Sequence, residues 1–433
     1  MTLAIFLSVL IIGILLGIPV AFSLLLSAIT LMLYMDLFTL STFTNGSNIL
    51  AQSLLNGVDS FALLAIPFFM VAGEVMSVGG LSQRIVRLAM AWVGHRKGGL
   101  GYVAIITSIV LAGLSGSAVA DAAALISILF PMMRKANYPE GYSAGLLGAG
   151  GIIAPVIPPS LPLIIVGVAG NISIAKLFLG GIVPGLLMGL GLMVTWRFII
   201  GNKELATTER ASKEERRAAF REGIWALILP FIIIGGIRTG VFTPTEAAVV
   251  AAVYALFVST VIYRELTLKA FYEVLVRSGR ATGMVMFLVG AAMVASWLIT
   301  VAQLPQQVAG MLGPLVDSPR LLMAAIMVLV LLIGMVMDLS PTILILVPLL
   351  MPVVREAGID PVYFGLMFVI NTCIGLLTPP VGNVLNVVCG VGKVRLDVAV
   401  RGLAPFVLVY IILLALFVIF PQIIIWPLKI IAG

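Results

Sequence analysis

Long apolar runs, interrupted at a few places by glycine, proline and serine, occupy most of this chain. Runs of roughly 17 to 25 apolar residues, the length that crosses a hydrocarbon layer as a helix, recur from the N-terminus to Trp426. Before Ser47 the pattern allows two interpretations, because Gly17 and Pro19 divide residues 3–34 into two short helices or bend a single one. The pattern predicts an all-α polytopic membrane protein and excludes a membrane β-barrel.

Two short apolar arms around a glycine- and serine-rich run do not fit the pattern of helices that simply cross the membrane. Residues 98–133 contain two apolar arms, one on each side of Gly113 to Ser117. Each arm has about 15 residues, or about 22 Å at 1.5 Å per residue, which is too short to span comfortably. We therefore expect a re-entrant helical hairpin at 98–133, with both of its ends on one side of the membrane.

A crossing helix with an internal break follows this hairpin. Residues 142–170 are apolar but contain the proline-rich stretch Ala154 to Pro162, and Leu177 to Ile200 then crosses back. Because proline removes a backbone donor and clashes with the preceding turn, we expect the helix at 142–170 to be broken at this stretch.

The middle of the chain carries the longest predicted loop and a basic segment. We expect residues 202–222 to form a charged loop, and Ile224–Ile237 and Ala247–Tyr263 to form two crossings. Thr243 to Glu246 has the spacing of a capping box in front of the second crossing. Arg264 to Arg280 is basic and partly amphipathic, which predicts a helix on the membrane surface.

The second half of the chain is predicted to contain the same succession of a crossing, a hairpin and a broken helix. These elements are a crossing at 281–301, hairpin arms at Leu321–Val336 and Ile343–Val354 with the tip Met337–Thr342, a helix at Tyr363–Val388 broken at Leu377–Asn383, and a last crossing at Gly402–Trp426.

Matched double prolines relate the two halves. The segment Gly113–Pro159 reappears, much altered, as Gly334–Pro380, 221 residues later, and this offset superposes Pro158-Pro159 on Pro379-Pro380. Paired interruptions at corresponding places in two halves of a membrane protein mark the centre of a transporter. The alternative is that the small residues only allow close helix packing, but packing does not account for the matched prolines.

Composition indicates that lipid surrounds most of the chain, and the distribution of charge indicates the orientation of the chain in the membrane. Apolar residues make up 61% of the 433 residues and charged residues only 10%, so lipid covers most of the surface. In the predicted topology all but five of the 25 basic residues lie on one side, together with Arg134. The positive-inside rule places this side in the cytoplasm and makes the repeats of this multi-pass protein inverted. The net charge of +7 therefore reflects topology and not nucleic-acid binding.

The predicted breaks have a chemical use. Broken helices expose backbone carbonyls and amides that hydrocarbon cannot satisfy, at a cost of several kcal/mol per group. Half-helix C-termini and free carbonyls suit a small cation such as Na⁺, and half-helix N-termini suit a carboxylate. We expect the first tip to face the first break, and Asp338, Ser340 and Thr342 to face the second, where Thr378 and Asn383 add oxygen ligands. Two symmetry-related Na⁺ sites with an organic acid between them follow.

Acidic residues inside apolar runs allow two interpretations. Asp121 follows the first tip, so it assists an ion site or caps the second hairpin arm, and the same choice holds for Asp338. Glu74, which we expect to be buried, is a functional carboxylate or a hydrogen-bond partner of a neighbouring helix. The chain has no His-rich metal motif and no nucleophile with a base nearby, so we expect no enzymatic activity.

Five strings of residues resemble signature motifs of one transporter family, the large membrane subunits of the TRAP (tripartite ATP-independent periplasmic) transporters. They are Gly113-Leu114-Ser115-Gly116-Ser117-Ala118-Val119-Ala120-Asp121, Gly151-Ile152-Ile153-Ala154-Pro155-Val156-Ile157-Pro158-Pro159-Ser160, Gly375-Leu376-Leu377-Thr378-Pro379-Pro380-Val381-Gly382-Asn383, Pro67-Phe68-Phe69 with Ala72-Gly73-Glu74, and Phe242-Thr243-Pro244-Thr245-Glu246-Ala247. The resemblance covers essentially the whole chain.

This resemblance implies a Na⁺-driven, elevator-type importer in the bacterial inner membrane that takes an organic acid from a periplasmic substrate-binding protein. It also implies a separate small membrane subunit of four helices. Substrates in the family include sialic acid, diketogulonate-type sugar acids and C4-dicarboxylates, and no residue in the chain chooses among them. The alternative is a stand-alone Na⁺/dicarboxylate carrier of a related inverted-repeat fold, which would need no binding protein.

The ion-site motifs of the family map onto both tips and both breaks. The predicted Na⁺ ligands are Ser115, Gly116, Ser117, Gly151, Ala154 and Pro155 in the first half, and Asp338, Ser340, Thr342, Thr378 and Gly382 in the second. The predicted substrate-binding residues are Ser117, Pro158, Ser160, Ser340, Thr378 and Asn383. Two Na⁺ ions are the expected cofactors, with no organic cofactor.

The expected division of the chain follows the repeats. It consists of N-terminal scaffold helices at 1–97, a first transport repeat at 98–200, a cytoplasmic loop with scaffold helices and an amphipathic arm at 201–280, a second transport repeat at 281–401 with its hairpin at 321–354 and broken helix at 363–388, and a C-terminal helix at 402–433.

Overall fold

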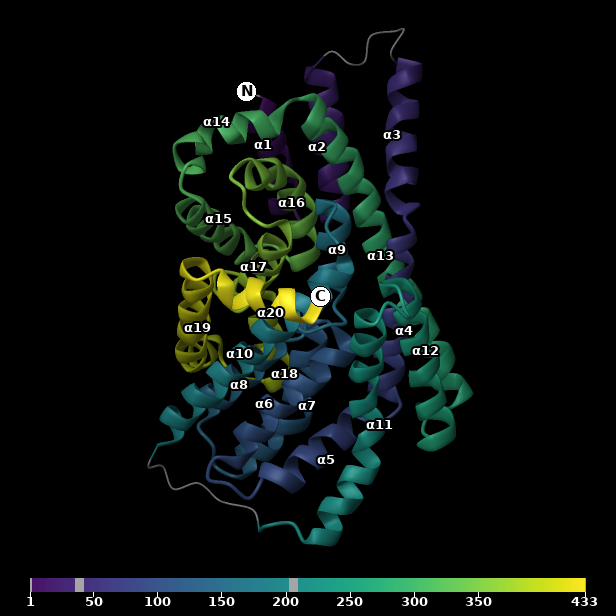
Figure 1. The fold of residues 1–433 in the computed structure, drawn as a ribbon, viewed down its shortest axis with the longest axis vertical. Helices are drawn as coiled ribbons and strands as arrows, with labels where there is room; N and C mark the ends of the chain where they lie inside the picture. Colours follow the sequence, from purple (N-terminus) through teal and green to yellow (C-terminus); the bar gives the residue numbers. More distant parts are fainter. Residues whose placement is uncertain (1, 36–42, 202–208, 433) are drawn as a thin grey trace.

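The structure is a computed structural model that describes residues 2–35, 43–201 and 209–432, with side chains apart from those of 43–49, 309, 311–314 and 432. Within these residues the only regular secondary structure is helical (Figure 1), which confirms the all-α prediction. The helices are α1 (Thr2–Leu15), α2 (Val20–Tyr34), α3 (Phe43–Val58), η1 (Phe61–Leu64), α4 (Ala65–Val78), α5 (Leu81–Val93), α6 (Gly99–Ser115), α7 (Ala118–Lys135), α8 (Glu140–Gly151), α9 (Leu161–Gly170), α10 (Ile174–Ile200), α11 (Lys213–Arg238), α12 (Pro244–Phe257), η2 (Val258–Ile262), α13 (Leu268–Val301), α14 (Leu304–Val316), α15 (Pro319–Gly334), α16 (Leu339–Glu356), α17 (Pro361–Gly375), α18 (Asn383–Gly392), α19 (Leu396–Ile419) and α20 (Gln422–Ala432).

The first 34 residues form two helices and not one bent helix. α1 ends at Leu15, α2 begins after Pro19, and the two helices lie side by side. They pack closely because Gly13 has no side chain: a Cβ at this position would come 2.7 Å from Ser23 Oγ. The chain changes direction at Gly17, whose φ of 78° is one that glycine adopts without strain.

Both predicted hairpins are present, with shorter tips than predicted. In the first hairpin only Gly116 and Ser117 separate α6 from α7, and Gly116 has a φ of 63°. In the second hairpin residues 335–338 separate α15 from α16. Ser340 and Thr342 therefore lie in the first turns of α16 and not in the tip.

Both predicted broken helices are also present. Residues 152–160 separate α8 from α9, and residues 376–382 separate α17 from α18. Each break contains its double proline, Pro158-Pro159 or Pro379-Pro380, and both of these peptide bonds are cis. Each double proline keeps its stretch out of a helix, because both rings lack an N–H donor and the residue before each proline is restricted to an extended conformation.

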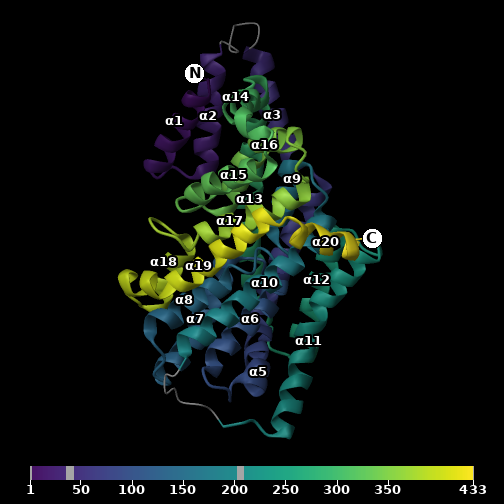
Figure 2. The ribbon, with the colours of Figure 1, turned by 60° about the vertical axis from the view of Figure 1, so that its left-hand side comes forward.

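The hairpins of the two repeats lie in opposite halves of the molecule. In Figure 1 and Figure 2 the hairpin of α6 and α7 occupies the lower half of the molecule, and the hairpin of α15 and α16 occupies the upper half. The broken helices meet between them, since α9 packs against α16, and α18 packs against α7 and α8. The predicted inverted repeat is therefore confirmed.

The segment after η2 differs from the prediction of a surface helix at 264–280 followed by a separate crossing at 281–301. α13 is one continuous helix through both segments. No proline interrupts it, and Gly279 and Gly283 each cost only about 1 kcal/mol relative to alanine, which is too little to break a helix of 34 residues.

Three other boundaries differ from the prediction. A capping box of Ser212 and Glu215 begins α11, so the second half of the predicted loop 202–222 is helical, while residues 202–208 lie outside the described residues. The short helix α14 has no counterpart in the prediction. The predicted last crossing, 402–426, consists of two helices, α19 and α20.

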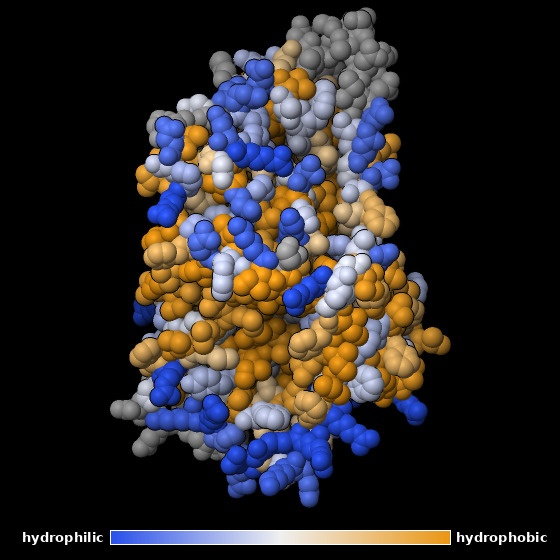
Figure 3. Space-filling view, viewed as in Figure 1, coloured by the Kyte–Doolittle hydropathy of each residue, from blue (hydrophilic) through white to orange (hydrophobic). Residues whose placement is uncertain are grey.

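The apolar surface has the distribution expected of a multi-pass membrane protein. Among the described residues, seven helical segments are long and apolar enough to cross a membrane: η1 with α4, α10, α11, α12 with η2, α13, α16 and α19. Figure 3 shows apolar side chains across the middle of one face and hydrophilic side chains gathered at its lower end, over α5 and the beginning of α11.

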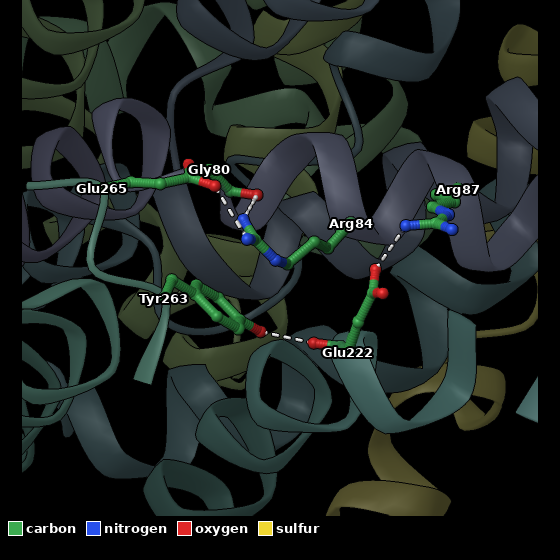
Figure 4. A network of polar contacts seen from close by, with 6 residues as sticks. All are labelled: Gly80, Arg84, Arg87, Glu222, Tyr263 and Glu265. Atoms are coloured by element: carbon green, nitrogen blue, oxygen red, sulfur yellow. Dashed lines mark hydrogen bonds and ion pairs between the residues drawn. The ribbon is translucent and has the colours of Figure 1, made fainter. Parts of the chain in front are cut away.

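A polar network joins α5 to α11 and to the segment after η2 (Figure 4). Arg84 pairs with Glu265 at 2.7 Å and lies 3.8 Å from the centre of the Tyr263 ring. The Tyr263 hydroxyl donates to the backbone carbonyl of Glu222 at 2.5 Å, and the carboxylate of Glu222 pairs with Arg87 at 2.7 Å. Burial raises the pKa of Tyr263 to about 12, so the phenol stays a donor at neutral pH.

The first repeat is joined to the last long helix by a crossing of α8 and α19 at glycines. A Cβ at Gly145 in α8 would come 2.7 Å from the carbonyl carbon of Gly402 in α19. Above this crossing the Tyr410 hydroxyl donates to the carbonyl of Ala149 at 2.8 Å. The close approach of the two backbones therefore depends on the missing side chains.

We expect Gly145→Ala to destabilise the protein by about 1–3 kcal/mol, because the added methyl group overpacks this crossing. Gly283→Ala in α13 is the matched control: a Cβ there meets nothing within 4 Å, so the exchange should leave stability unchanged or raise it through helix propensity. The melting temperatures of the detergent-purified variants measure the difference. Equal melting temperatures for the two variants would contradict the tight crossing.

Candidate functional site

A cavity of about 300 Å³ lies where the two repeats meet. It is bounded by the first hairpin tip, the first break, the beginning of α9 and the beginning of α16, and α4 and α13 contribute one side chain each. Its lining residues are Met70, Gly116, Ser117, Ala118, Val119, Pro155, Leu161, Pro162, Ile165, Val285, Asp338, Leu339, Ser340 and Leu376. Five predicted site residues thus come together from distant parts of the sequence: Gly116, Ser117, Pro155, Asp338 and Ser340.

Three helix N-termini point towards this cavity. Ser117 is the N-cap of α7 and accepts a hydrogen bond from the amide of Ala120, and Ser160 is the N-cap of α9. Asp338 is the N-cap residue of α16, without a side-chain capping bond. Because each N-terminus carries unpaired N–H groups and a positive partial charge, their convergence favours an anionic ligand.

The first hairpin also holds a buried carboxylate. Asp121 is 4% exposed, and its Oδ1 accepts a short hydrogen bond from the Ser115 hydroxyl, which itself accepts one from the amide of Ser117 at 3.2 Å. Asp121 Oδ2 is buried with no hydrogen-bond partner in the part of the chain that the structure describes. A buried, unpaired carboxylate oxygen is costly, so this position fits a bound cation.

The two hairpins carry the same chemical groups in exchanged places. The offset of 221 residues relates Ser117 to Asp338 at the N-cap, and Asp121 to Thr342 four positions later. In the second hairpin the Thr342 hydroxyl donates to the backbone carbonyl of Asp338 at 2.7 Å. Each second arm therefore begins with one carboxylate and one hydroxyl, in opposite order.

The first break packs directly against the first hairpin. A Cβ at Gly116 would come 2.9 Å from the carbonyl oxygen of Pro159, and a Cβ at Gly151 would come 2.7 Å from the Cβ of Ala122. The Ser160 hydroxyl donates to the carbonyl of Pro155 at 2.5 Å. The remaining predicted residues of this half, Ala154 and Pro158, are buried in the same break.

The second break is arranged differently. The amides of Val381 and Gly382 both donate to the carbonyl of Met335 in the second tip, at 3.2 Å. The Thr378 hydroxyl donates to the carbonyl of Ile374, near the end of α17, at 2.8 Å. Of this break and the adjoining end of α18, only Leu376 lines the cavity, and Thr378, Gly382 and Asn383 do not. Thr378 instead lines an apolar groove of about 300 Å³ against α19.

Glu74 is not the buried acid that its position in an apolar run predicts. Its side chain is 39% exposed, and its Oε2 lies 3.8 Å from a guanidinium nitrogen of Arg277. Arg277 also lies 3.5 Å from Glu273, one turn away on α13. The geometry is that of a partly exposed charge cluster between α4 and α13.

Several residues of this region are absent from the prediction. Met70 and Val285 supply the cavity wall from α4 and α13, and nothing in an apolar run identifies them. Asn371 in α17 is fully buried, with its amide nitrogen donating to the carbonyl of Met327 at 2.5 Å and its Oδ1 unpaired in the described structure. Because it is a lone asparagine within the apolar run 361–375, Asn371 could have been identified from the sequence.

Sequence comparison connects this chain to a family of transporters. Residues 7–423 match the family described as "Tripartite ATP-independent periplasmic transporter, DctM component". The chain is 56% identical over 429 residues to the 2,3-diketo-L-gulonate TRAP transporter large permease protein of Escherichia coli, with 99% of each chain covered. It is 42% identical over 406 residues to the sialic acid TRAP transporter large permease protein of Vibrio cholerae, with 94% of this chain and 93% of the relative covered.

Structural comparison finds the same fold in a distant protein. The crystal structure of the YdaH transporter of Alcanivorax borkumensis superposes with a TM-score of 0.67, covering 90% of this chain and 91% of that chain. The sequences are 15% identical, so this likeness concerns the fold alone.

If Asp121 serves a cation site, Na⁺ should raise the melting temperature of the purified protein relative to choline at equal ionic strength. A ligand at 100 times its Kd stabilises a protein by about 2.7 kcal/mol, and Asp121→Asn should remove most of this effect. Asp397→Asn, which removes a carboxylate that pairs with Arg395 on α19, is the control and should keep the Na⁺ effect. A wild-type melting temperature indifferent to Na⁺ would refute the site.

Proposed function

This chain belongs to the large permease proteins of the TRAP transporters, which are multi-pass proteins of the inner membrane, and we propose that it imports an organic acid together with Na⁺. The family consists of transporter permeases, so the protein moves its substrate and does not convert it. The observation that carries the proposal is the convergence of the N-termini of α7, α9 and α16 on one cavity between the repeats.

A sugar acid is the substrate class that we propose. The relative from E. coli is named for 2,3-diketo-L-gulonate, and the relative from V. cholerae for sialic acid. The cavity offers positive helix ends for a carboxylate, and the hydroxyls of Ser117 and Ser340 for sugar hydroxyls. Its volume of about 300 Å³ is at the lower end for ligand sites, which favours a diketogulonate-type acid over the larger sialic acid.

Charge supports the coupling to Na⁺. Asp338 lies on the cavity rim, and a substrate carboxylate about 5 Å away would be repelled by roughly 3 kcal/mol at an effective dielectric constant of 20. A cation beside Asp338 offsets this repulsion, and a second cation beside Asp121 satisfies its unpaired oxygen. We therefore propose one Na⁺ site at each hairpin, so that the substrate binds well only when Na⁺ is bound.

We propose an elevator-type movement for the transport step. The two hairpins and two broken helices pack on one another, whereas α4 and α13 contribute only one side chain each to the cavity wall. The hairpins and breaks would move as one body against a scaffold that contains α4, α11, α12 and α13. The network of Arg84, Glu222 and Tyr263 braces that scaffold.

The description of the family as tripartite supports two partners for this chain. We propose that these are a small membrane subunit of four helices and a periplasmic substrate-binding protein that delivers the acid. The alternative function is a stand-alone Na⁺/dicarboxylate carrier of a related inverted-repeat fold. The need for a binding protein separates the two functions.

In proteoliposomes that contain both membrane subunits, uptake of 2,3-diketogulonate should need the cognate binding protein and an inward Na⁺ gradient. Ser340→Ala should raise the binding-protein concentration that gives half-maximal uptake by up to about tenfold, because it removes a hydrogen bond to a substrate hydroxyl. Ser127→Ala, which removes an exposed hydroxyl from α7, is the control and should leave uptake unchanged.

Two results would count against this function. Full uptake of free substrate without a binding protein would favour the stand-alone carrier. Equal uptake with Na⁺ and with choline would show that transport is not coupled to Na⁺. Loss of activity in Ser340→Ala together with Ser127→Ala would indicate a general folding defect and not a substrate contact.

An elevator predicts that joining the hairpin to the scaffold stops transport. Val285→Cys in α13 and Leu339→Cys in α16 line the same cavity from the two proposed bodies. In a background without Cys373 and Cys389, oxidation of this pair should abolish uptake, and reduction should restore it. Single-cysteine variants are the controls. A cross-linked protein that transports at the wild-type rate would contradict the movement.

A further inference from the structure

A second pocket, separate from the cavity between the repeats, lies at the ends of α6 and α10 that the topology places at the cytoplasmic surface. It has a volume of about 400 Å³ and is lined by Lys97, Tyr102, Arg197, Phe198, Ile200 and Gly201. Two basic and two aromatic side chains thus surround one hollow at the level where the chain leaves the membrane. This is the composition of a membrane interface, where aromatic rings and basic groups gather.

The basic groups of this pocket are unpaired. Lys97 and Arg197 are both exposed, and neither forms an ion pair within residues 2–35, 43–201 and 209–432. No acidic residue is among those that line the pocket. The pocket therefore carries a net positive charge, on the side of the membrane whose lipid surface is negative.

The walls of the pocket are held in place. The Trp196 indole donates from Nε1 to the carbonyl of Gly98 at 2.9 Å, and its ring stacks on Tyr138 with the ring centres 6.1 Å apart. The Tyr138 hydroxyl in turn accepts a hydrogen bond from the amide of Leu100 at 3.4 Å. These contacts fix the beginning of α6 to the end of α10, so Lys97 and Arg197 extend from a rigid base.

An apolar stripe on α10 leads to this pocket. Leu186, Leu190, Val194 and Phe198 are all exposed, and Phe198 is 80% exposed. Their spacing of four residues places them along one face of the helix, about 6 Å apart and about 18 Å in total. This length is similar to half the thickness of the hydrocarbon layer, about 15 Å.

We propose that this pocket and stripe bind one anionic phospholipid of the inner leaflet. Lys97 and Arg197 hold the phosphate, Tyr102 and Phe198 lie at the level of the glycerol backbone, and one acyl chain follows the stripe on α10. The stripe favours a lipid over a free phosphate ion, because only a lipid has an acyl chain that can pack against an apolar helix face. The proposal does not depend on the substrate or on the ion coupling.

The test is a titration of the purified full-length chain, with its small subunit where the two co-purify, in an uncharged detergent. Native mass spectrometry follows the binding of phosphatidylglycerol and of phosphatidylcholine with the same acyl chains. We expect phosphatidylglycerol to bind at least tenfold more tightly. Lys97→Gln with Arg197→Gln should weaken its binding about 30-fold, since each basic residue at a membrane surface contributes roughly fivefold.

Lys269→Gln with Arg280→Gln is the matched control, because it removes the same charge from exposed positions on α13. This pair should bind phosphatidylglycerol as the wild type does. Phe198→Ser, which interrupts the stripe and keeps both charges, should also weaken binding. Melting temperatures confirm that each variant is folded.

Three outcomes would overturn the proposal. Equal affinity for the two lipids would remove the role of charge. An equal loss of affinity for phosphatidylglycerol in the pocket variant and in the control would show that only the net charge of the protein matters. Displacement of phosphatidylglycerol by inorganic phosphate at similar concentration, with no effect of Phe198→Ser, would make this a soluble-anion site.

Discussion

The fold depends on one constraint: within hydrocarbon every backbone N–H and C=O must find a partner inside the protein. The breaks at 152–160 and 376–382 release such groups in the middle of the membrane domain, and the protein supplies partners for them. The second tip offers the Met335 carbonyl to two amides of the second break, and the Ser160 hydroxyl reaches the Pro155 carbonyl in the first. The N-termini of α7, α9 and α16, which begin at these interruptions and hairpin tips, converge on one cavity. The proposed binding site therefore lies where the helices are interrupted.

The two hairpins carry similar polar groups, but these groups differ in their exposure. A carboxylate and a hydroxyl begin each second arm, but the carboxylate is buried at Asp121 and exposed on the cavity rim at Asp338. Burial makes a charge more dependent on its partner, so the proposed cation should matter more at the first hairpin than at the second. The two proposed sites should therefore differ in affinity.

The sequence predicts well the features that are local. The hairpins, the breaks and the capping box of Thr243 and Glu246 are all present, because proline, glycine and capping residues act within a few positions. It predicts poorly the features that depend on tertiary packing. Glu74 lies in an apolar run, but only the fold brings Arg277 beside it, and only the fold turns Thr378 away from the cavity. The continuity of α13 was missed because a basic stretch and an apolar stretch form one helix when no proline divides them.

The crossing of α8 and α19 has a consequence for biosynthesis. α8 is among the first parts of the transport repeats to leave the ribosome, but the helix that covers its glycine face begins on the order of 245 residues later. At translation rates of 5–20 residues per second, this face waits roughly 12–50 s in the bilayer without its partner. During that interval its exposed glycine backbone can pair with other nascent helices. A truncation that removes α19 should therefore leave the glycine face of α8, a much earlier part of the chain, without its partner.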